Sequence, residues 1–223
     1  MITEGYFFSI NFLKENFLEI CKIMLIPFLL VLLFFSIDTN SKQISIDNDP
    51  TKSLLFIFSD PAFLFYLLYD LWVSIIVIMF IDDRKSKKQR NIVNYYFQSL
   101  FFIIPILIAG LFSLFLIICG LFMFILPGIY IGIRMIFVPY LIVVRRTSII
   151  DSFKFSFTLS ESKVSDILYF IIPFFIFALF YVQTSSSINI MINLVINYFL
   201  ITPLIYSYMY FLYIRYSSEY ENL

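Results

Sequence analysis

The sequence contains no histidine, two cysteines, five glycines and a single tryptophan among its 223 residues. Without histidine, and with Cys21 and Cys119 far apart in the chain, it has no basis for a Ser-His-Asp centre, a Cys-His centre or a zinc site. Two cysteines are too few for a disulfide framework, so we expect buried free thiols. No Walker loop, nucleophile elbow or dinucleotide-binding glycine motif occurs. We therefore expect no metal, no cofactor and no enzymatic activity.

Charged residues are also scarce, at 13% of the chain, and the 15 Lys and Arg balance the 15 Asp and Glu. A protein that binds nucleic acid needs a basic excess on one face, so this balance argues against such a partner. Hydrophobic residues make up 61%, and the mean hydropathy is +0.95. A soluble domain is roughly 45–50% apolar. The composition therefore predicts an all-α, polytopic membrane helix bundle.

The longest apolar run extends from Leu100 to Val144 and carries one charge, Arg134. A spanning helix needs about 20 apolar residues, so this run is long enough to cross a membrane twice and has to turn within its length. The local turn signal is Leu126-Pro127-Gly128, because proline removes a backbone donor and glycine tolerates left-handed conformations. The run therefore predicts a helical hairpin with its turn at these three residues.

The same reasoning along the chain predicts a single membrane domain, 1–223, with about six transmembrane helices. The expected spans are 20–37, 61–81, 101–126, 129–144, 166–183 and 188–210. Residues 1–19 place apolar side chains at helical spacing beside charged ones, which predicts an N-terminal amphipathic interfacial helix. No basic region precedes an apolar run there and no cleavage site follows, so it does not read as a secretory signal.

Two polar segments separate these spans on the expected cytoplasmic side. Residues 82–90 read DDRKSKKQR, and such a basic run is typical of a topology determinant. Asp82 and Asp83 are expected on the solvated surface. In residues 145–165, Ser148 and Asp151 match a capping box, and Ile149, Ile150, Phe153 and Phe157 share one helical face. This segment predicts an in-plane cytoplasmic helix.

The distribution of Lys and Arg predicts the orientation. With the N-terminus inside, twelve of them fall in cytoplasmic segments and two, Lys42 and Lys52, in outer loops. Basic residues favour the cytoplasmic side of a membrane. We therefore expect both termini in the cytoplasm. The twelve are Lys14, Lys22, Arg84, Lys85, Lys87, Lys88, Arg90, Arg145, Arg146, Lys154, Lys163 and Arg215.

A stretch between residues 127 and 162 resembles the YciC-like family of bacterial inner-membrane proteins. The residues that carry the resemblance are Pro127, Gly128, Ile129, Pro139, Ser152, Lys154, Ser156, Leu159 and Ser160. Ser160 stands where the family has threonine, and Arg134 where it has an apolar residue. The resemblance implies a multi-pass inner-membrane protein without an assigned biochemical activity. A looser likeness to membrane domains attached to glycerophosphodiester phosphodiesterases points to lipid-related work.

Two charged residues fall inside the expected spans, Asp70 and Arg134. Their distances from the outer ends of the helices, at 1.5 Å per residue, correspond to depths of about 13 and 9 Å. Charged side chains within a membrane are costly and usually pair, so we expect an intramembrane ion pair. The alternative is that Arg134 extends toward the interface while Asp70 is protonated or faces a polar crevice.

Two hypotheses for function follow. The first is a non-enzymatic envelope protein that acts through its helices or loops, with membrane lipids as its partners. The alternative is a small transporter or lipid-handling protein with a polar site between helices. Gly128 and Gly132, like Ala109 and Ser113, have the spacing of small residues at helix contacts. That spacing fits packing within the monomer better than a helix–helix partner or a homo-oligomer.

Overall fold

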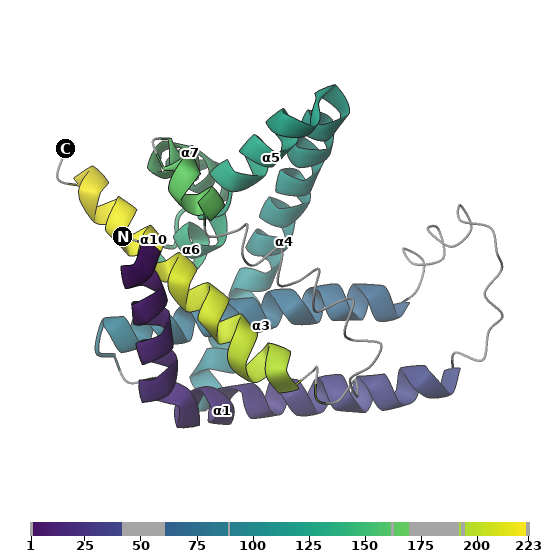
Figure 1. The fold of residues 1–223 in the computed structure, drawn as a ribbon. Coiled ribbons are helices and arrows are strands. Elements are labelled where there is room, and N and C mark those ends of the chain that lie inside the picture. Colours follow the sequence, from purple (N-terminus) through teal and green to yellow (C-terminus); the bar gives the residue numbers. More distant parts are fainter. Residues whose placement is uncertain are drawn as a thin grey trace.

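The computed structural model describes residues 2–41, 61–88, 90–161, 163–169, 192 and 195–221, and all regular structure within them is helical (Figure 1). The fold class is therefore all-α. The polar loop expected after the first span, and most of the expected fifth span, lie outside the described residues.

The helices are labelled as in Figure 1. They are α1 (Ile2–Ser41), α3 (Pro61–Lys85), α4 (Ile92–Met123), α5 (Ile125–Arg134), α6 (Val138–Val144), α7 (Ile149–Ser160), the π-helix η1 (Asn197–Ile201) and α10 (Thr202–Glu221). Residues 164–169 are also helical.

Four stretches within the described residues are long and apolar enough to cross a membrane: Thr3–Phe34, Phe65–Lys85, Ile92–Phe122 and Ile125–Val144. The third is the most apolar, with a mean hydropathy of 2.9, and only 11% of it is buried inside the protein. Phe101 is 80% exposed and Phe122 is 88% exposed. A water-soluble monomer rarely exposes so large a contiguous apolar surface. The chain is a membrane protein.

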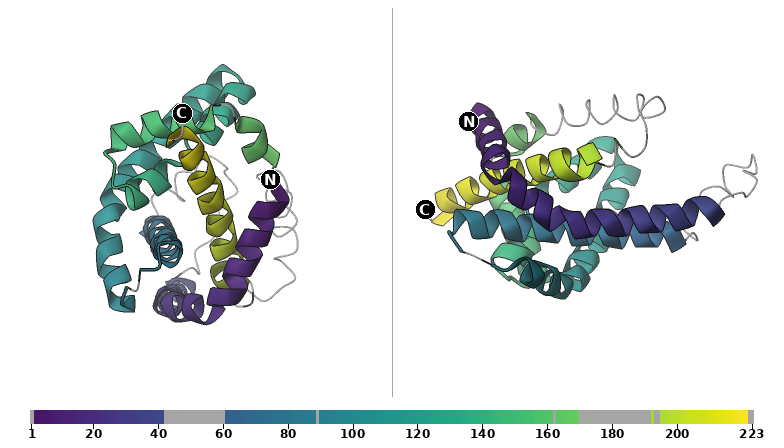
Figure 2. Two further views of the ribbon diagram at one scale, coloured as in Figure 1. Left: turned by 90° about the vertical axis from the view of Figure 1, so that its left-hand side faces the viewer. Right: turned by 90° about the horizontal axis from the view of Figure 1, so that it is seen from below.

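The first helix is longer than expected, because the segments expected as an interfacial helix and as a first span form the single helix α1. Figures 1 and 2 show that its first part runs across the direction of the rest, so the helix bends. The first part packs along α10. This packing brings the two ends of the chain together.

The centre of the bundle is α3, which contacts α1, α4, α6 and α10. Figure 2 shows it end-on among its neighbours. Val73, Ile75, Ile76, Ile78 and Ile81 are all fully buried. These five positions are distributed around the whole circumference of α3. A helix that is apolar on every side is typically buried in the core. The distribution therefore agrees with the central position of α3.

The hairpin expected in the long apolar run is present, but the turn expected at Leu126-Pro127-Gly128 is displaced. The helix breaks at Phe124, which has an extended backbone (φ −163°, ψ 153°), and α5 begins at Ile125. Pro127 therefore lies in the first turn of α5, where its missing N–H leaves no helical bond unmade. Gly128 is helical and no glycine has a positive φ in the described residues. Pro105, expected in the first turn of the third helix, instead lies well inside α4.

Gly128 serves close packing rather than the turn. A Cβ placed on Gly120 would lie 2.8 Å from the Cα of Gly128, and one placed on Gly128 would lie 2.8 Å from the backbone nitrogen of Leu121. No ordinary side chain fits either gap. The absent side chains therefore let α5 fold back directly onto α4 (Figure 1).

The expected fourth span, 129–144, is divided. A turn at residues 135–137 separates α5 from α6, and Pro139 lies in the first turn of α6, another position where proline is tolerated.

Ser148 caps α7: its hydroxyl oxygen accepts a hydrogen bond from the backbone N–H of Asp151 at 3.2 Å. This confirms the capping box expected from the sequence.

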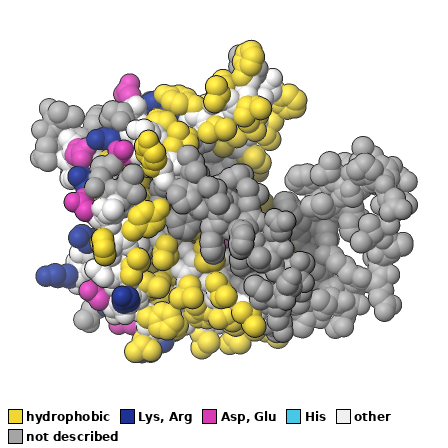
Figure 3. Space-filling model, viewed as in Figure 1, with side chains coloured by type: hydrophobic (Ala, Val, Ile, Leu, Met, Phe, Trp, Pro, Cys, Tyr) yellow, Lys and Arg dark blue, Asp and Glu magenta, His cyan; other side chains and the backbone are white. Residues whose placement is uncertain are grey.

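Charged side chains gather at one end of the protein. Figure 3 shows them along the edge where both termini lie in Figure 1, while hydrophobic side chains cover much of the remaining described surface in that view. The end of α3 also lies there, since Lys85 and Arg215 line the same pocket. We call this region the charged end.

Candidate functional site

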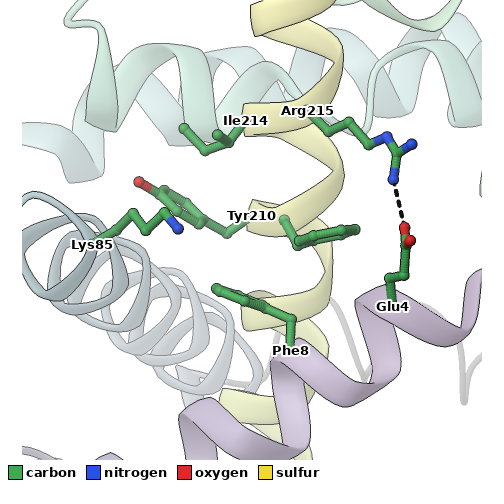
Figure 4. A pocket seen from close by; sticks show the side chains of 7 residues that line it. Glu4, Phe8, Lys85, Tyr210, Ile214 and Arg215 are labelled. Carbon is green, nitrogen blue, oxygen red and sulfur yellow. Dashed lines mark hydrogen bonds and ion pairs between the residues drawn. The ribbon is translucent and has the colours of Figure 1, made fainter. Parts of the chain in front are cut away.

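A pocket of about 330 Å³ lies at the charged end, between the first part of α1, the last turn of α3 and the middle of α10 (Figure 4). The residues that line it are Glu4, Phe8, Lys85, Tyr210, Phe211, Ile214 and Arg215. Three helices that are distant in sequence thus contribute to one site. We call it the terminal pocket.

One wall of the terminal pocket is a neutralised pair of charges. The Arg215 guanidinium donates a hydrogen bond to Glu4 Oε2 at 2.8 Å, drawn as a dashed line in Figure 4. Its Nε also lies 3.6 Å from Glu219 Oε1. The bond with Glu4 raises the pKa of Arg215 above its ordinary value. Arg215 therefore stays charged and ties the C-terminal helix to the start of α1.

The opposite wall of the terminal pocket carries the cation Lys85. Lys85 forms no ion pair within the described part of the chain, and its Nζ lies 5.7 Å from the centroid of the Phe8 ring. Figure 4 shows its side chain reaching toward Tyr210. Phe8 and Phe211 pack together with ring centroids 5.4 Å apart. The pocket thus presents an available ammonium group beside aromatic and aliphatic surface.

The basic run of residues 82–90 contacts the bundle through the two acidic residues in the last part of α3. Asp83 is 1% exposed, and Arg90 contacts both of its oxygens, at 3.1 Å from Nη2 and 3.0 Å from Nε. Asp82 accepts a hydrogen bond from the Tyr210 hydroxyl at 2.8 Å. The expectation that Asp82 and Asp83 lie on the solvated surface is therefore wrong for Asp83. The local pattern gave no sign of a partly buried arginine partner seven residues away.

Another tether at this end joins the segment after α7 to α10. Lys163 Nζ lies 2.9 Å from Glu219 Oε2 and 5.4 Å from the centroid of the Tyr216 ring. The hydrogen bond from Lys163 lowers the pKa of Glu219 below its ordinary value. This ion pair joins the end of α10 to the segment that follows α7.

Arg134 is buried, at 8% exposed, where α5 meets α7. Its guanidinium donates to the Tyr130 hydroxyl and, at 2.7 Å, to the backbone carbonyl of Phe157. The rings of these two residues lie 5.3 and 5.1 Å from its guanidinium carbon. Carbonyl and aromatic groups thus compensate this charge in place of a carboxylate.

The ion pair expected between Asp70 and Arg134 is not formed. Asp70 is exposed on α3, and no ion pair or hydrogen bond joins it to Arg134. The estimate from residue counts placed both side chains at a similar depth. Depth does not specify which way a side chain points around its helix, and Arg134 points toward α7.

Four of the residues that resemble the YciC-like family lie on the side of α7 that faces this contact. Ser152, Ser156, Leu159 and Ser160 form the buried face of α7, whereas Lys154 is exposed. The hydroxyls of Ser156 and Ser160 donate to the backbone carbonyl of Arg134, at 2.7 and 3.3 Å. The buried face of α7 is thus mainly small and polar. The phenylalanine and isoleucine face expected from the sequence is only partly buried, and Ile150 is 68% exposed.

Sequence reasoning did not identify the terminal pocket. Lys85 and Arg215 entered the sequence argument only through the orientation count, and Phe8 did not enter it. Glu4 and Arg215 are separated by 211 positions, so no local pattern links them. Within the described residues, no group of His, Cys, Asp and Glu is placed to hold a metal ion.

Comparison of the chain with known protein families, curated proteins and solved structures finds no match. The geometry of the described residues therefore carries the functional argument.

Proposed function

We propose that the chain is a multi-pass protein of a bacterial inner membrane that binds an anionic amphiphile, of the phospholipid class, in the terminal pocket. It acts by binding and not by catalysis. The observation that carries the proposal is Lys85, an ammonium group that faces apolar walls and has no carboxylate partner among the described residues. A phosphate group would supply the missing counter-charge, and the aromatic surface of Phe8 and Phe211 would accept the apolar part of the ligand.

The proposed topology has six spans and both termini in the cytoplasm. It is supported by the gathering of both termini and the charged side chains at one end of the protein (Figures 1 and 3). Basic residues favour the cytoplasmic side, so the terminal pocket opens toward the inner leaflet. Membership of the YciC-like family, proposed from the residues between 127 and 160, agrees with this arrangement.

The proposal is tested with the purified full chain in detergent. Binding of dihexanoyl phosphatidylglycerol and dihexanoyl phosphatidylcholine is measured by native mass spectrometry. We expect the anionic lipid to bind more tightly and Lys85→Gln to weaken its binding about fivefold, because one basic residue near an anionic lipid contributes about 1 kcal/mol.

Lys88→Gln is the matched control, since Lys88 is exposed three residues further along and lines no part of the terminal pocket. It should leave the affinity unchanged. Equal affinities for the two lipids, or equal effects of the two substitutions, would show that the terminal pocket is not the binding site.

A small transporter is the second candidate function, and Asp70 favours it. A carboxylate within a candidate span is costly in lipid and commonly marks a substrate or proton path. Asp70 is exposed on α3 and forms no ion pair with another described residue. Proton uptake into proteoliposomes, measured for the native chain and for Asp70→Asn, tests this function. Uptake that Asp70→Asn abolishes would favour transport, and equal rates would exclude a role for Asp70.

A further inference from the structure

A second pocket, of about 440 Å³, lies between the first half of α4 and the connection from α6 to α7. Gln98, Phe101, Phe102 and Pro105 contribute from α4, and Arg146 and Thr147 from the connection. No residue of this pocket lines the terminal pocket. We call it the lateral pocket.

The two arginines in the connection between α6 and α7 differ in their contacts. Arg145 is held by the bundle through a hydrogen bond to the Ser217 hydroxyl of α10. Arg146 is exposed and forms no ion pair or side-chain hydrogen bond within the described residues. Its neighbour Thr147 is anchored, because its hydroxyl bonds to the Leu141 carbonyl at 3.1 Å and the Ser152 hydroxyl at 2.7 Å. A fixed backbone thus presents an unpaired guanidinium at the lateral pocket.

The other wall of the lateral pocket is lipid-facing. Phe101 is 80% exposed, and its neighbour Phe97 is 65% exposed. Both lie on α4, the most apolar and least buried of the candidate spans. Lipid chains are therefore the natural neighbours of this wall. An arginine at the edge of such a surface matches a lipid whose headgroup carries negative charge and whose chains are apolar.

We propose that the lateral pocket binds one anionic phospholipid of the leaflet at the charged end. Its phosphate contacts the Arg146 guanidinium, the Gln98 amide donates a further hydrogen bond, and an acyl chain lies against Phe101 and Pro105. Arginine suits this role because its planar guanidinium can bind two phosphate oxygens together. This inference goes beyond the ligand of the terminal pocket, because the lateral lipid stays within the bilayer.

The test uses the full chain carrying Lys85→Gln, so that the result does not depend on the terminal pocket. Native mass spectrometry measures the affinity for dipalmitoyl phosphatidylglycerol and dipalmitoyl phosphatidylcholine, with inorganic phosphate as competitor. We expect a preference for the anionic lipid that inorganic phosphate at millimolar concentration does not remove. Adding Arg146→Gln should lower the phosphatidylglycerol affinity about fivefold and leave the phosphatidylcholine affinity unchanged.

Arg146→Lys, which keeps the charge, should retain much of the preference, and Lys88→Gln should retain all of it. Size-exclusion chromatography shows whether each variant remains folded, and Gln98→Ala, which should also weaken phosphatidylglycerol binding, replaces Arg146→Gln if that variant is not. Equal binding of the two lipids would overturn the proposal, as would an unchanged preference for phosphatidylglycerol in the chain that carries Arg146→Gln or its replacement Gln98→Ala. Displacement of the lipid by inorganic phosphate would also overturn it and would identify a soluble anion as the ligand.

Discussion

Gly5 shows how one missing side chain sets the contact between the ends of the chain. A Cβ at this position would lie 2.6 Å from Cε2 of Tyr208, a ring that is fully buried in α10. The tyrosine has no room to move outward because it is packed on every side. The first part of α1 can therefore approach α10 only with glycine at position 5.

Replacing Gly5 by alanine should destabilise the protein. The substitution improves helix propensity by about 1 kcal/mol, but overpacking typically costs about 1–3 kcal/mol. Gly110→Ala is the matched control, because a Cβ there meets no atom within 4 Å. We expect the thermal midpoint in detergent to be lower for Gly5→Ala than for Gly110→Ala. Equal midpoints would show that the Tyr208 contact is not tight.

The contact between α5 and α7 depends on Arg134. Arg134→Met removes the bond to the Phe157 carbonyl, and a hydrogen bond from a charged group is worth about 1.5–3 kcal/mol. We expect faster hydrogen exchange in α7 and unchanged exchange in α3. The charge swap Asp70→Arg with Arg134→Asp should not restore the loss, because the two residues do not pair. Restoration by the swap would show that they do.

At the scale of elements, the hairpin of α4 and α5 depends on the close approach of Gly120 and Gly128. Gly132 also faces α4, with a Cβ there 3.5 Å from Cδ1 of Ile117. Both glycines of the G-x-x-x-G spacing therefore face a helix of the same chain. This favours packing within the monomer over a homo-oligomer through Gly128 and Gly132.

The two interpretations differ in what Gly128→Leu does. If the glycines pack the hairpin, the substitution lowers the thermal midpoint of the monomer, since the new side chain overlaps Leu121. The measurement is thermal unfolding combined with size-exclusion chromatography coupled to light scattering. Gly110→Leu serves as control at an open position. Dissociation of an oligomer with an unchanged midpoint would instead assign these glycines to an interface between chains.

At the scale of the whole molecule, the proposed topology places the charged end on the cytoplasmic side of the membrane. A reporter that is active only outside the cytoplasm should give signal when fused after Asn48 and none when fused after Lys88 or Leu223. Neutralising Arg84, Lys85, Lys87, Lys88 and Arg90 together should disturb insertion, because this segment holds the largest share of the basic residues expected inside. Signal after Lys88 would reverse the proposed topology.

The sequence by itself determined the class of protein, the helical hairpin and the start of α7. These properties depend on composition, on the length of apolar runs and on side chains three or four residues apart, all of which are local. It also placed Pro127 and Gly128 at the hairpin, although their roles differ from those expected. Proline is as acceptable in a first helical turn as in a loop, and glycine serves close packing as well as turns.

Only the tertiary structure decided which side chains share a site. The terminal pocket joins Glu4 and Phe8 to Lys85 and Arg215, and Arg134 finds its partner in the carbonyl of Phe157. Such contacts depend on the rotation of each helix about its axis and on where α1 bends. In a chain that is apolar on nearly every helical face, the hydrophobic pattern does not specify that rotation, so packing between distant helices sets it.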